Sequence, residues 1–150
     1  MKSNDDDLML FYFGYQTFIK TADDIISQYG MNRQHHRFLF FISKLPDITV
    51  KELLQLMEIS KQGSHETLKT LKAQNLIEER PAEHDRRMKQ LHATHEGEAL
   101  IQKLNQAQIE LFQTVFESAG TDWHEVIEAF ASKRPGYEII SQFKNKKKSD

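Results

Sequence analysis

The sequence predicts a mainly α-helical protein that carries a small β-hairpin wing, the fold class called winged helix-turn-helix. Three observations predict it. Two short helical patterns joined by a tight turn begin after Ile48, two short alternating segments follow, and a polar tip with adjacent arginines, residues 83–87, separates those segments. Longer helical patterns flank this region on both sides. Where elements follow this order, the second short helix can enter the major groove of duplex DNA.

The composition is that of an ordinary globular chain. Its 150 residues suffice for one compact subunit, and 28% charged and 39% hydrophobic side chains are typical values. The chain has no cysteine and no apolar run of membrane-spanning length, so thiol chemistry is excluded and we expect a cytoplasmic protein. The net charge is -2, but residues 60–92 hold seven basic and five acidic side chains. A small basic region on an acidic chain favours a site-specific DNA reader over a protein that coats polyanions.

The first two helices are predicted from their caps and apolar spacing. The adjacent carboxylates of Asp5 to Asp7 favour a helix N-terminus. From Leu8 to Ile26 apolar residues recur at spacings of three and four, which indicates an amphipathic helix of about five turns. Asn32 is the expected N-cap of a second helix, which Pro46-Asp47 ends. The crowded aromatic side chains of the first helix favour core or dimer packing over a pocket lining, although an interface can combine the two.

The next two helices form the expected helix-turn-helix. Thr49 is followed by Glu52 at the spacing of a capping box, and Ser60 is the expected cap of the helix over 61–74. That helix separates an inner face from a polar outer face. The inner residues are Ser64, Thr67, Leu68 and Leu71, and the outer residues are Gln62, His65, Glu66, Lys69 and Lys72. A polar outer face on the second helix is typical of a recognition helix.

A hairpin follows the helix-turn-helix. Asn75 is expected in the left-handed conformation that ends a helix, because asparagine is the best substitute for glycine there. Segments 76–80 and 88–93 alternate as strands do. Thr94 is then the expected cap of a helix of about six turns.

Three breaks divide the end of the chain. Ser118-Ala119-Gly120 ends the long helix, and Thr121 is the expected cap of the helix after it. Pro135-Gly136 ends that helix, and 137–143 are expected to form a last apolar turn or two. Residues 144–150 are expected to be a frayed, solvated basic tail.

The terminal helices are more apolar than one small winged domain can cover, so they require a partner. The simplest partner is the same set of helices on a second chain, in a two-fold dimer. We therefore expect dimerisation helices at 8–46 and 94–143, a winged helix-turn-helix at 47–93 and a basic tail at 144–150. Two recognition helices about one DNA turn apart would also multiply the specific contacts.

A set of short motifs follows in a fixed order along the chain: Thr49-x-x-Glu52-Leu53-Leu54, Ile59-Ser60, Leu68-x-x-Leu71, Leu76-Ile77, Asp85-Arg86-Arg87 and Leu91-x-x-Thr94-x-x-Gly97. With these motifs the chain resembles the MarR family of bacterial transcriptional regulators over nearly its whole length. The resemblance implies a homodimer that binds double-stranded DNA at a near-palindromic operator. It also implies a cleft between each winged domain and the dimer helices, where a small, often aromatic, acid or drug-like effector lowers DNA affinity. Two residues depart from the family pattern, Asn75 in place of the usual glycine and Glu66 in place of a basic or small residue.

The polar and charged groups of the winged region are the candidates for DNA contact: Ser60, Lys61, Gln62, Ser64, His65, Glu66, Lys69, Lys72, Arg86, Arg87 and Lys89. Lys61, Lys72 and Lys89 are expected at phosphates, whereas Glu66 can accept a hydrogen bond from a cytosine amino group. Arg87, or else Arg86, is expected in the minor groove. Asp85 is expected to structure the wing by pairing with Arg86 or with the backbone. A possible ligand cleft is formed by Phe11, Tyr15, His36 and Phe40, whose alternative role is packing in the core.

The sequence gives less support to an enzyme or a metal-binding protein. The chain has no glycine-rich phosphate loop, nucleophile elbow or paired acidic groups, so we expect no enzyme activity and no cofactor. His65-Glu66 begins like a zinc-protease motif, but Lys69 replaces the second histidine. His92 and His95 lack acidic or cysteine neighbours, so we expect no metal site. A metal-responsive regulator of the same fold, or a winged-helix protein-interaction module without DNA binding, remains the alternative.

Overall fold

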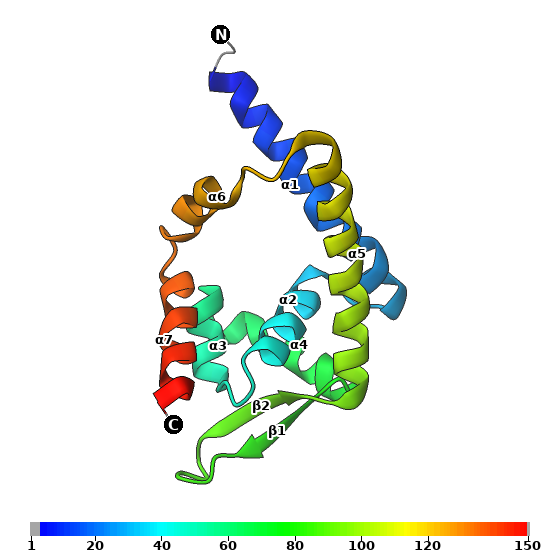
Figure 1. Ribbon diagram of the computed structural model, residues 1–150. Coiled ribbons are helices and arrows are strands. Elements are labelled where there is room, and N and C mark those ends of the chain that lie inside the picture. The colour runs from blue at the N-terminus through cyan, green and yellow to red at the C-terminus, as the bar shows by residue number, and fades with distance from the viewer. Residues whose placement is uncertain (1–3, 150) are drawn as a thin grey trace.

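The computed structural model describes residues 4–149, with side chains as far as residue 145. Within that range the elements, labelled in Figure 1, are α1 (Asn4–Ile26), the 3-10 helix η1 (Ser27–Tyr29), α2 (Arg33–Lys44), α3 (Val50–Met57), α4 (Lys61–Ala73), β1 (Ile77–Pro81), β2 (Lys89–Ala93), α5 (His95–Ala119), α6 (His124–Ala131) and α7 (Pro135–Ser149). A mainly helical chain with one two-stranded antiparallel hairpin confirms the predicted fold class. No helix in the described range is long and apolar enough to cross a membrane.

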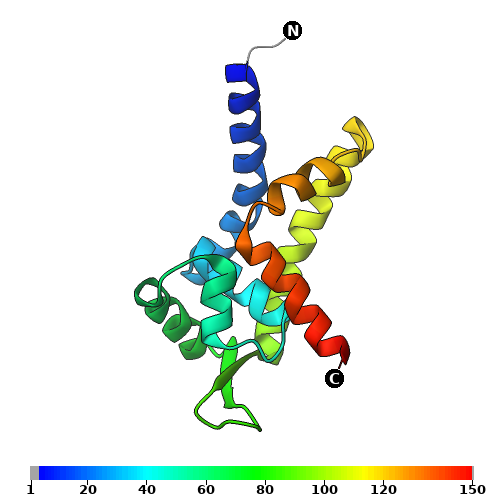
Figure 2. The same cartoon turned by 90° about the vertical axis from the view of Figure 1, so that its left-hand side faces the viewer.

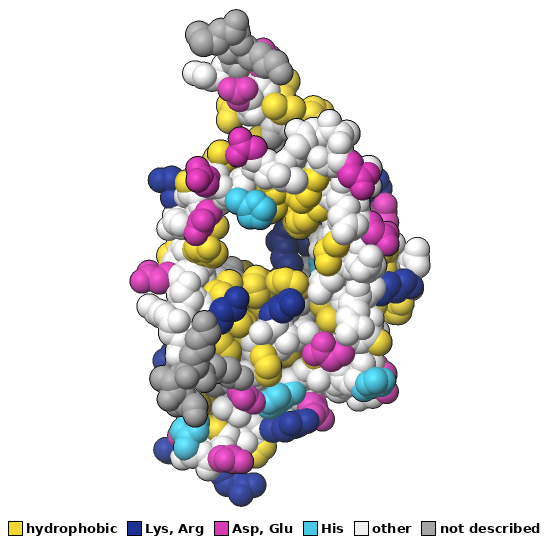
Figure 3. Space-filling model, viewed as in Figure 1, with side chains coloured by type: hydrophobic (Ala, Val, Ile, Leu, Met, Phe, Trp, Pro, Cys, Tyr) yellow, Lys and Arg dark blue, Asp and Glu magenta, His cyan; other side chains and the backbone are white. Residues whose placement is uncertain are grey.

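The elements form a compact body with two arms. Helices α2, α3 and α4 and the hairpin lie together at one end, where the first half of α5 joins them (Figure 1). The start of α1 and the end of α5 extend away from that body, and α6 and α7 return from the far end of α5 to α3 (Figures 1 and 2). The chain therefore encloses an opening between α5 on one side and α6 and α7 on the other, and Figure 3 shows that side chains do not fill it.

The hydrophobic core lies in the compact body. Its most deeply buried side chains come from α2, α3, α4, β2 and the first half of α5: Phe38, Leu39, Ile42, Leu53, Leu71, Leu91, Ile101 and Leu104. The end of α1 adds Ala22 and Ile26 to this core. The rest of the arms, as far as the structure describes them, contributes no fully buried apolar side chain to it. Burial of each large apolar side chain stabilises the fold by about 1.5–3 kcal/mol, so most of the stabilising burial lies around the winged region.

Helix starts in this body follow the predicted caps. Four side-chain oxygens accept hydrogen bonds from the first-turn amides of the helices that they precede: those of Asn32, Thr49, Ser60 and Thr94. Glu52 completes the predicted box, because its carboxylate accepts the Thr49 amide at 3.0 Å. Asn75 has φ 58°, the left-handed conformation predicted at the end of α4. These local rules set the boundaries of the helix-turn-helix.

The hairpin is joined to the start of the helix-turn-helix. β1 and β2 pair antiparallel from Ile77 opposite Ala93 to Pro81 opposite Lys89. On its other edge β2 meets the segment before α3, where the Leu91 amide donates to the Ile48 carbonyl at 2.8 Å. The wing is therefore fixed against α3 as well as against the end of α4.

Two glycines allow close approaches that a side chain would block. A Cβ on Gly97 would lie 2.0 Å from the Leu76 carbonyl oxygen, so this residue lets α5 begin against the end of α4. A Cβ on Gly136 would lie 1.9 Å from the Leu56 carbonyl oxygen, so this residue lets α7 dock on α3. Both contacts tie a flanking helix to the winged region.

The end of the chain differs from the prediction in two ways. Thr121 does not cap α6, because the helix starts later, after Trp123, and has no side-chain cap. Pro135 begins a helix instead of only ending one, which suits its fixed φ and missing amide proton. That helix continues to Ser149, so the backbone from 144 to 149 is helical and not frayed. Residue 150 and the side chains of 146–149 lie outside the described part.

Candidate nucleic-acid interface

The outer face of α4 is polar and exposed, because its inner face packs into the core. The polar set Gln62, His65, Glu66, Lys69 and Lys72 is exposed, as are Ser60 and Lys61 at the start of the helix. Ser64 is an exception, because it is buried and its hydroxyl donates to the Lys61 carbonyl at 2.7 Å. Ser64 lines the floor of the groove on this face and is covered in this conformation, and Ser60 acts as the helix cap.

A groove of about 910 Å³ runs along this face of α4 and is bordered by Val50 of α3 and Glu79 of β1. Lys72 forms an ion pair with Glu79 across it. Within the described chain, Lys61, Lys69 and Lys89 make no ion pair, and all three are exposed. These three lysines, one at the start of α4, one along it and one on β2, are available to phosphate oxygens, whereas Lys72 would first have to leave Glu79.

The tip of the wing is held by Asp85. Its Oδ1 accepts the backbone amide of Arg87 at 3.0 Å and the Arg87 Nε at 3.3 Å. Asp85 therefore holds the backbone, as one alternative predicted, but its side-chain partner is Arg87, the arginine expected in the minor groove, and not Arg86. The Arg87 side chain is still 93% exposed, against 37% for Asp85, so its terminal nitrogens face solvent. Asp85 thus orients Arg87 without covering it.

A histidine and a carboxylate join the root of the wing to the loop before α3. The Nε2 of His92 on β2 is hydrogen-bonded to Oδ1 of Asp47. Asp47 has φ 75°, a left-handed conformation that non-glycine residues rarely adopt. Across the described residues there is no group of three or more His, Asp or Glu side chains that could hold a metal. This histidine therefore contributes to the orientation of the wing.

A second candidate site is a mostly apolar pocket of about 240 Å³ between α1, α2 and α5. Its lining consists of Phe18, Ile19, Ala22, Asp23, Arg33, His36, Arg37, Phe40, Phe41 and Gln108. Two of the predicted cleft residues, His36 and Phe40, line it. Tyr15 lies near its rim, where its hydroxyl accepts from Arg37 Nη2 at 3.1 Å. Phe11 lies elsewhere, with its ring centroid 5.5 Å from that of Phe130 on α6.

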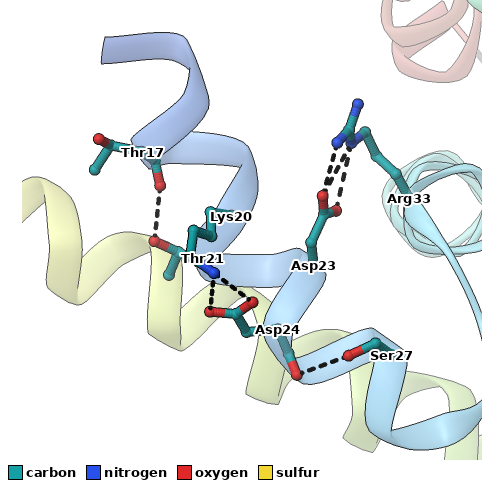
Figure 4. A network of polar contacts seen from close by, with 7 residues as sticks. All are labelled: Thr17, Lys20, Thr21, Asp23, Asp24, Ser27 and Arg33. Carbon is teal, nitrogen blue, oxygen red and sulfur yellow. Dashed lines mark hydrogen bonds and ion pairs between the residues drawn. The ribbon is translucent and has the colours of Figure 1, made fainter. Parts of the chain in front are cut away.

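The polar groups of this pocket differ in how strongly they are held. Asp23 of α1 accepts from Arg33 Nη2 at 2.7 Å and from Arg33 Nε at 3.2 Å, as Figure 4 shows. That hydrogen bond raises the pKa of the Arg33 guanidinium. Among the described residues, the hydrogen-bond partner of Arg37 is the hydroxyl of Tyr15. Burial lowers the pKa of His36, the charge of Arg37 lowers it further, and the charge of Asp23 partly offsets both.

Sequence reasoning missed four residues in and beside this pocket. It assigned no role to Asp23, Arg33 or Arg37, because charged residues on helices are ordinary surface residues unless a partner is known. It also gave no role to Gln34, whose side chain reaches α4, where it donates to the Gly63 carbonyl and the Thr67 hydroxyl, both at 2.9 Å. Arg33, Gln34 and Arg37 lie within about one turn of the buried His36 on α2, which was their one local signal, whereas Asp23 on α1 had none.

Comparisons with known proteins agree with this geometry. A family model described as MarR family matches residues 29–88. The chain is 32% identical over 122 residues to the HTH-type transcriptional regulator PetP of Rhodobacter capsulatus, covering 79% of this chain and 74% of PetP. The S. aureus MepR–DNA complex has a TM-score of 0.65 at 17% identity, covering 89% of this chain and 96% of that one. CouR from Rhodococcus jostii RHA1 bound to p-coumaroyl-CoA has a TM-score of 0.67 at 13% identity, covering 89% and 92%.

Proposed function

The chain belongs to the MarR family of transcriptional regulators, and on that premise we propose that it is a homodimeric repressor which a small-molecule ligand releases from its operator. The observation that carries the proposal is the exposed polar face of α4 beside a wing whose tip presents Arg87. A helix in the major groove and an arginine in the minor groove would read a half-site together.

The roles at DNA follow from the chemistry of the exposed groups. Gln62 and His65 can donate to or accept from base edges, and Glu66 can accept from a cytosine amino group. Lys61, Lys69 and Lys89 would neutralise phosphates and so make the affinity depend on salt. We assign the minor groove to Arg87, whose Nε bonds to Asp85 while the side chain stays exposed.

The dimer is supported by apolar side chains on the arms. The first half of α1 exposes Leu8, Met9, Leu10, Phe11, Tyr12 and Phe13, and α6 exposes Val126, Ile127 and Phe130. Figure 3 shows hydrophobic side chains along the border of the opening between the arms. Patches of this kind on a water-facing surface are typical of interfaces. A second copy in two-fold symmetry would cover them and would place two recognition helices on one face of the duplex.

The ligand role is assigned to the pocket between α1, α2 and α5. Its aromatic walls suit a planar ring, and Arg37 at its rim suits a carboxylate or phenolate. Support for a ligand in this fold comes from CouR, a relative whose structure holds p-coumaroyl-CoA. A small aromatic acid is therefore the ligand class that we propose.

The test begins with selection of a duplex from a random library by the native protein, followed by anisotropy titrations at fixed salt. We expect a near-palindromic site and weaker binding in the presence of aromatic carboxylates or phenols that raise the melting temperature. A compound that stabilises the protein and leaves DNA affinity unchanged would exclude the release mechanism, because linkage requires different affinities in the two states. Failure to select any duplex would exclude DNA reading itself.

A further inference from the structure

The first turn of α2 contacts both the pocket and the recognition helix through adjacent residues. Arg33 is held by Asp23 of α1 through three contacts of 2.7, 3.2 and 3.4 Å. Gln34, the next residue, donates from Nε2 to the Gly63 carbonyl and to the Thr67 hydroxyl of α4, both at 2.9 Å. One helical turn therefore connects α1, the pocket and α4.

The acceptors of Gln34 lie directly behind the surface proposed to read DNA. Gly63 is in the first turn of α4, and Thr67 is buried one turn later. The outward-facing residues of the same two turns are Gln62, His65 and Glu66. A displacement of the Gln34 amide would therefore be passed to the part of α4 that faces the bases.

We propose that Gln34 is the positioning residue through which the pocket controls the orientation of α4. The proposal rests on the proposed function, because it assumes that α4 reads DNA and that the pocket takes an anionic ligand. Gln34 contacts neither DNA nor ligand in this scheme. It acts through Gly63 and Thr67.

The input to this connection is the ion pair between Asp23 and Arg33. Arg33 and Arg37 both line the pocket, so the acidic group of a ligand bound at Arg37 would also compete with Asp23 for the Arg33 guanidinium. Loss of the Asp23 contact would free the first turn of α2 from α1. Because Arg33 and Gln34 are adjacent on that turn, the backbone cannot move at one without moving at the other. The ligand would thus favour an α2 position in which α4 is displaced, which is the differential binding that a switch requires.

The contact of Asp23 with Arg33 and the contact of Gln34 with α4 act in series, so loss of either one should have the same effect on DNA binding. Asp23→Asn imitates the occupied pocket by weakening the pair with Arg33, and Gln34→Met removes the amide while keeping the length of the side chain. Each should weaken binding to the selected duplex by about threefold to tenfold, the effect of one or two hydrogen bonds. The double variant should bind within about twofold of the weaker single variant, because a chain broken once transmits nothing further.

The measurement is the dissociation constant of four proteins (native, two single variants and the double variant) by anisotropy at fixed salt, beside their melting temperatures. Gln28→Met, at an exposed glutamine of η1, is the matched control and should combine with Asp23→Asn multiplicatively. A purely structural role for Gln34 would lower the melting temperature and give multiplicative losses of DNA affinity, and that result would overturn the proposal. Native protein that selects no duplex would instead refute the proposed function, so the two failures are distinguishable.

Discussion

The compact body and the helical arms of this protein differ in how far their apolar side chains are buried within one chain. In the compact body around the winged region, α2, α3, α4, β2 and the start of α5 bury one another within a single chain, and Leu53, Leu71 and Leu91 are fully enclosed. In the arms, large apolar residues of α1 and α6 face solvent, among them Phe13 at 65% and Val126 at 60% exposure. The difference supports the proposal that a second copy of the chain covers the arms, because large exposed apolar patches are typical of interfaces.

The largest expected effect is on the stability of the compact body. Leu53→Ala should lower the free energy of unfolding by about 2–5 kcal/mol, because it leaves a cavity in a core that cannot collapse around it. Urea denaturation followed by circular dichroism measures this loss. Phe13→Ala should change the unfolding of isolated monomer by much less. If both variants lowered the free energy of unfolding of the monomer equally, the two regions would not differ in burial.

A charge placed on an arm should disrupt the dimer and leave the fold of the compact body intact. Phe13→Asp should move the protein from dimer to monomer in sedimentation velocity and leave the circular dichroism of the winged region unchanged, because a carboxylate cannot be buried without a partner. Gln55→Asp, at an exposed position on α3, is the matched control and should stay dimeric. A Phe13→Asp protein that keeps the native sedimentation coefficient would place the dimer contact elsewhere.

At the wing, Arg87→Ala should weaken binding to the selected duplex by about tenfold or more while the dimer persists, since one minor-groove or base contact contributes about 1–3 kcal/mol. Arg86→Ala should weaken binding less, and equally for all sequences, as loss of a phosphate contact does. Titrations at fixed salt with selected and scrambled duplexes separate the two. An unchanged affinity for Arg87→Ala would refute the assignment of this wing residue.

The smallest expected effect is on pH dependence. Burial lowers the pKa of His36, and burial also lowers that of His35, so the unfolded chain binds protons more readily than the folded one just below their ordinary value. Stability should therefore fall as the pH drops from 7 to 5. His36→Gln should flatten that slope in urea titrations at several pH values, and an unchanged slope would show that His36 titrates normally.

The features that the sequence could predict are those that depend on nearby residues. Caps at Thr49 and Thr94 and the left-handed Asn75 depend on neighbours within a few residues, so local rules located them. Exposure of the outer face of α4 followed from its periodicity.

The features that sequence reasoning missed depend on residues far apart in the chain. The contact of Gln34 with α4 joins residues 29 and 33 positions apart, and no local pattern marks it. Gly136 is recognisable as a helix breaker, yet its role is to let α7 approach the Leu56 carbonyl of α3. Thr121 failed as a cap because α6 begins later, after Trp123.

The central claim is that two copies of this chain read one operator, each with a complete winged region. Sedimentation equilibrium of the protein with its selected duplex tests that claim most directly, because it gives the number of chains on each duplex. We predict two chains per duplex, and a much weaker complex for Phe13→Asp. One chain per duplex, or full affinity in a monomeric Phe13→Asp protein, would contradict the account.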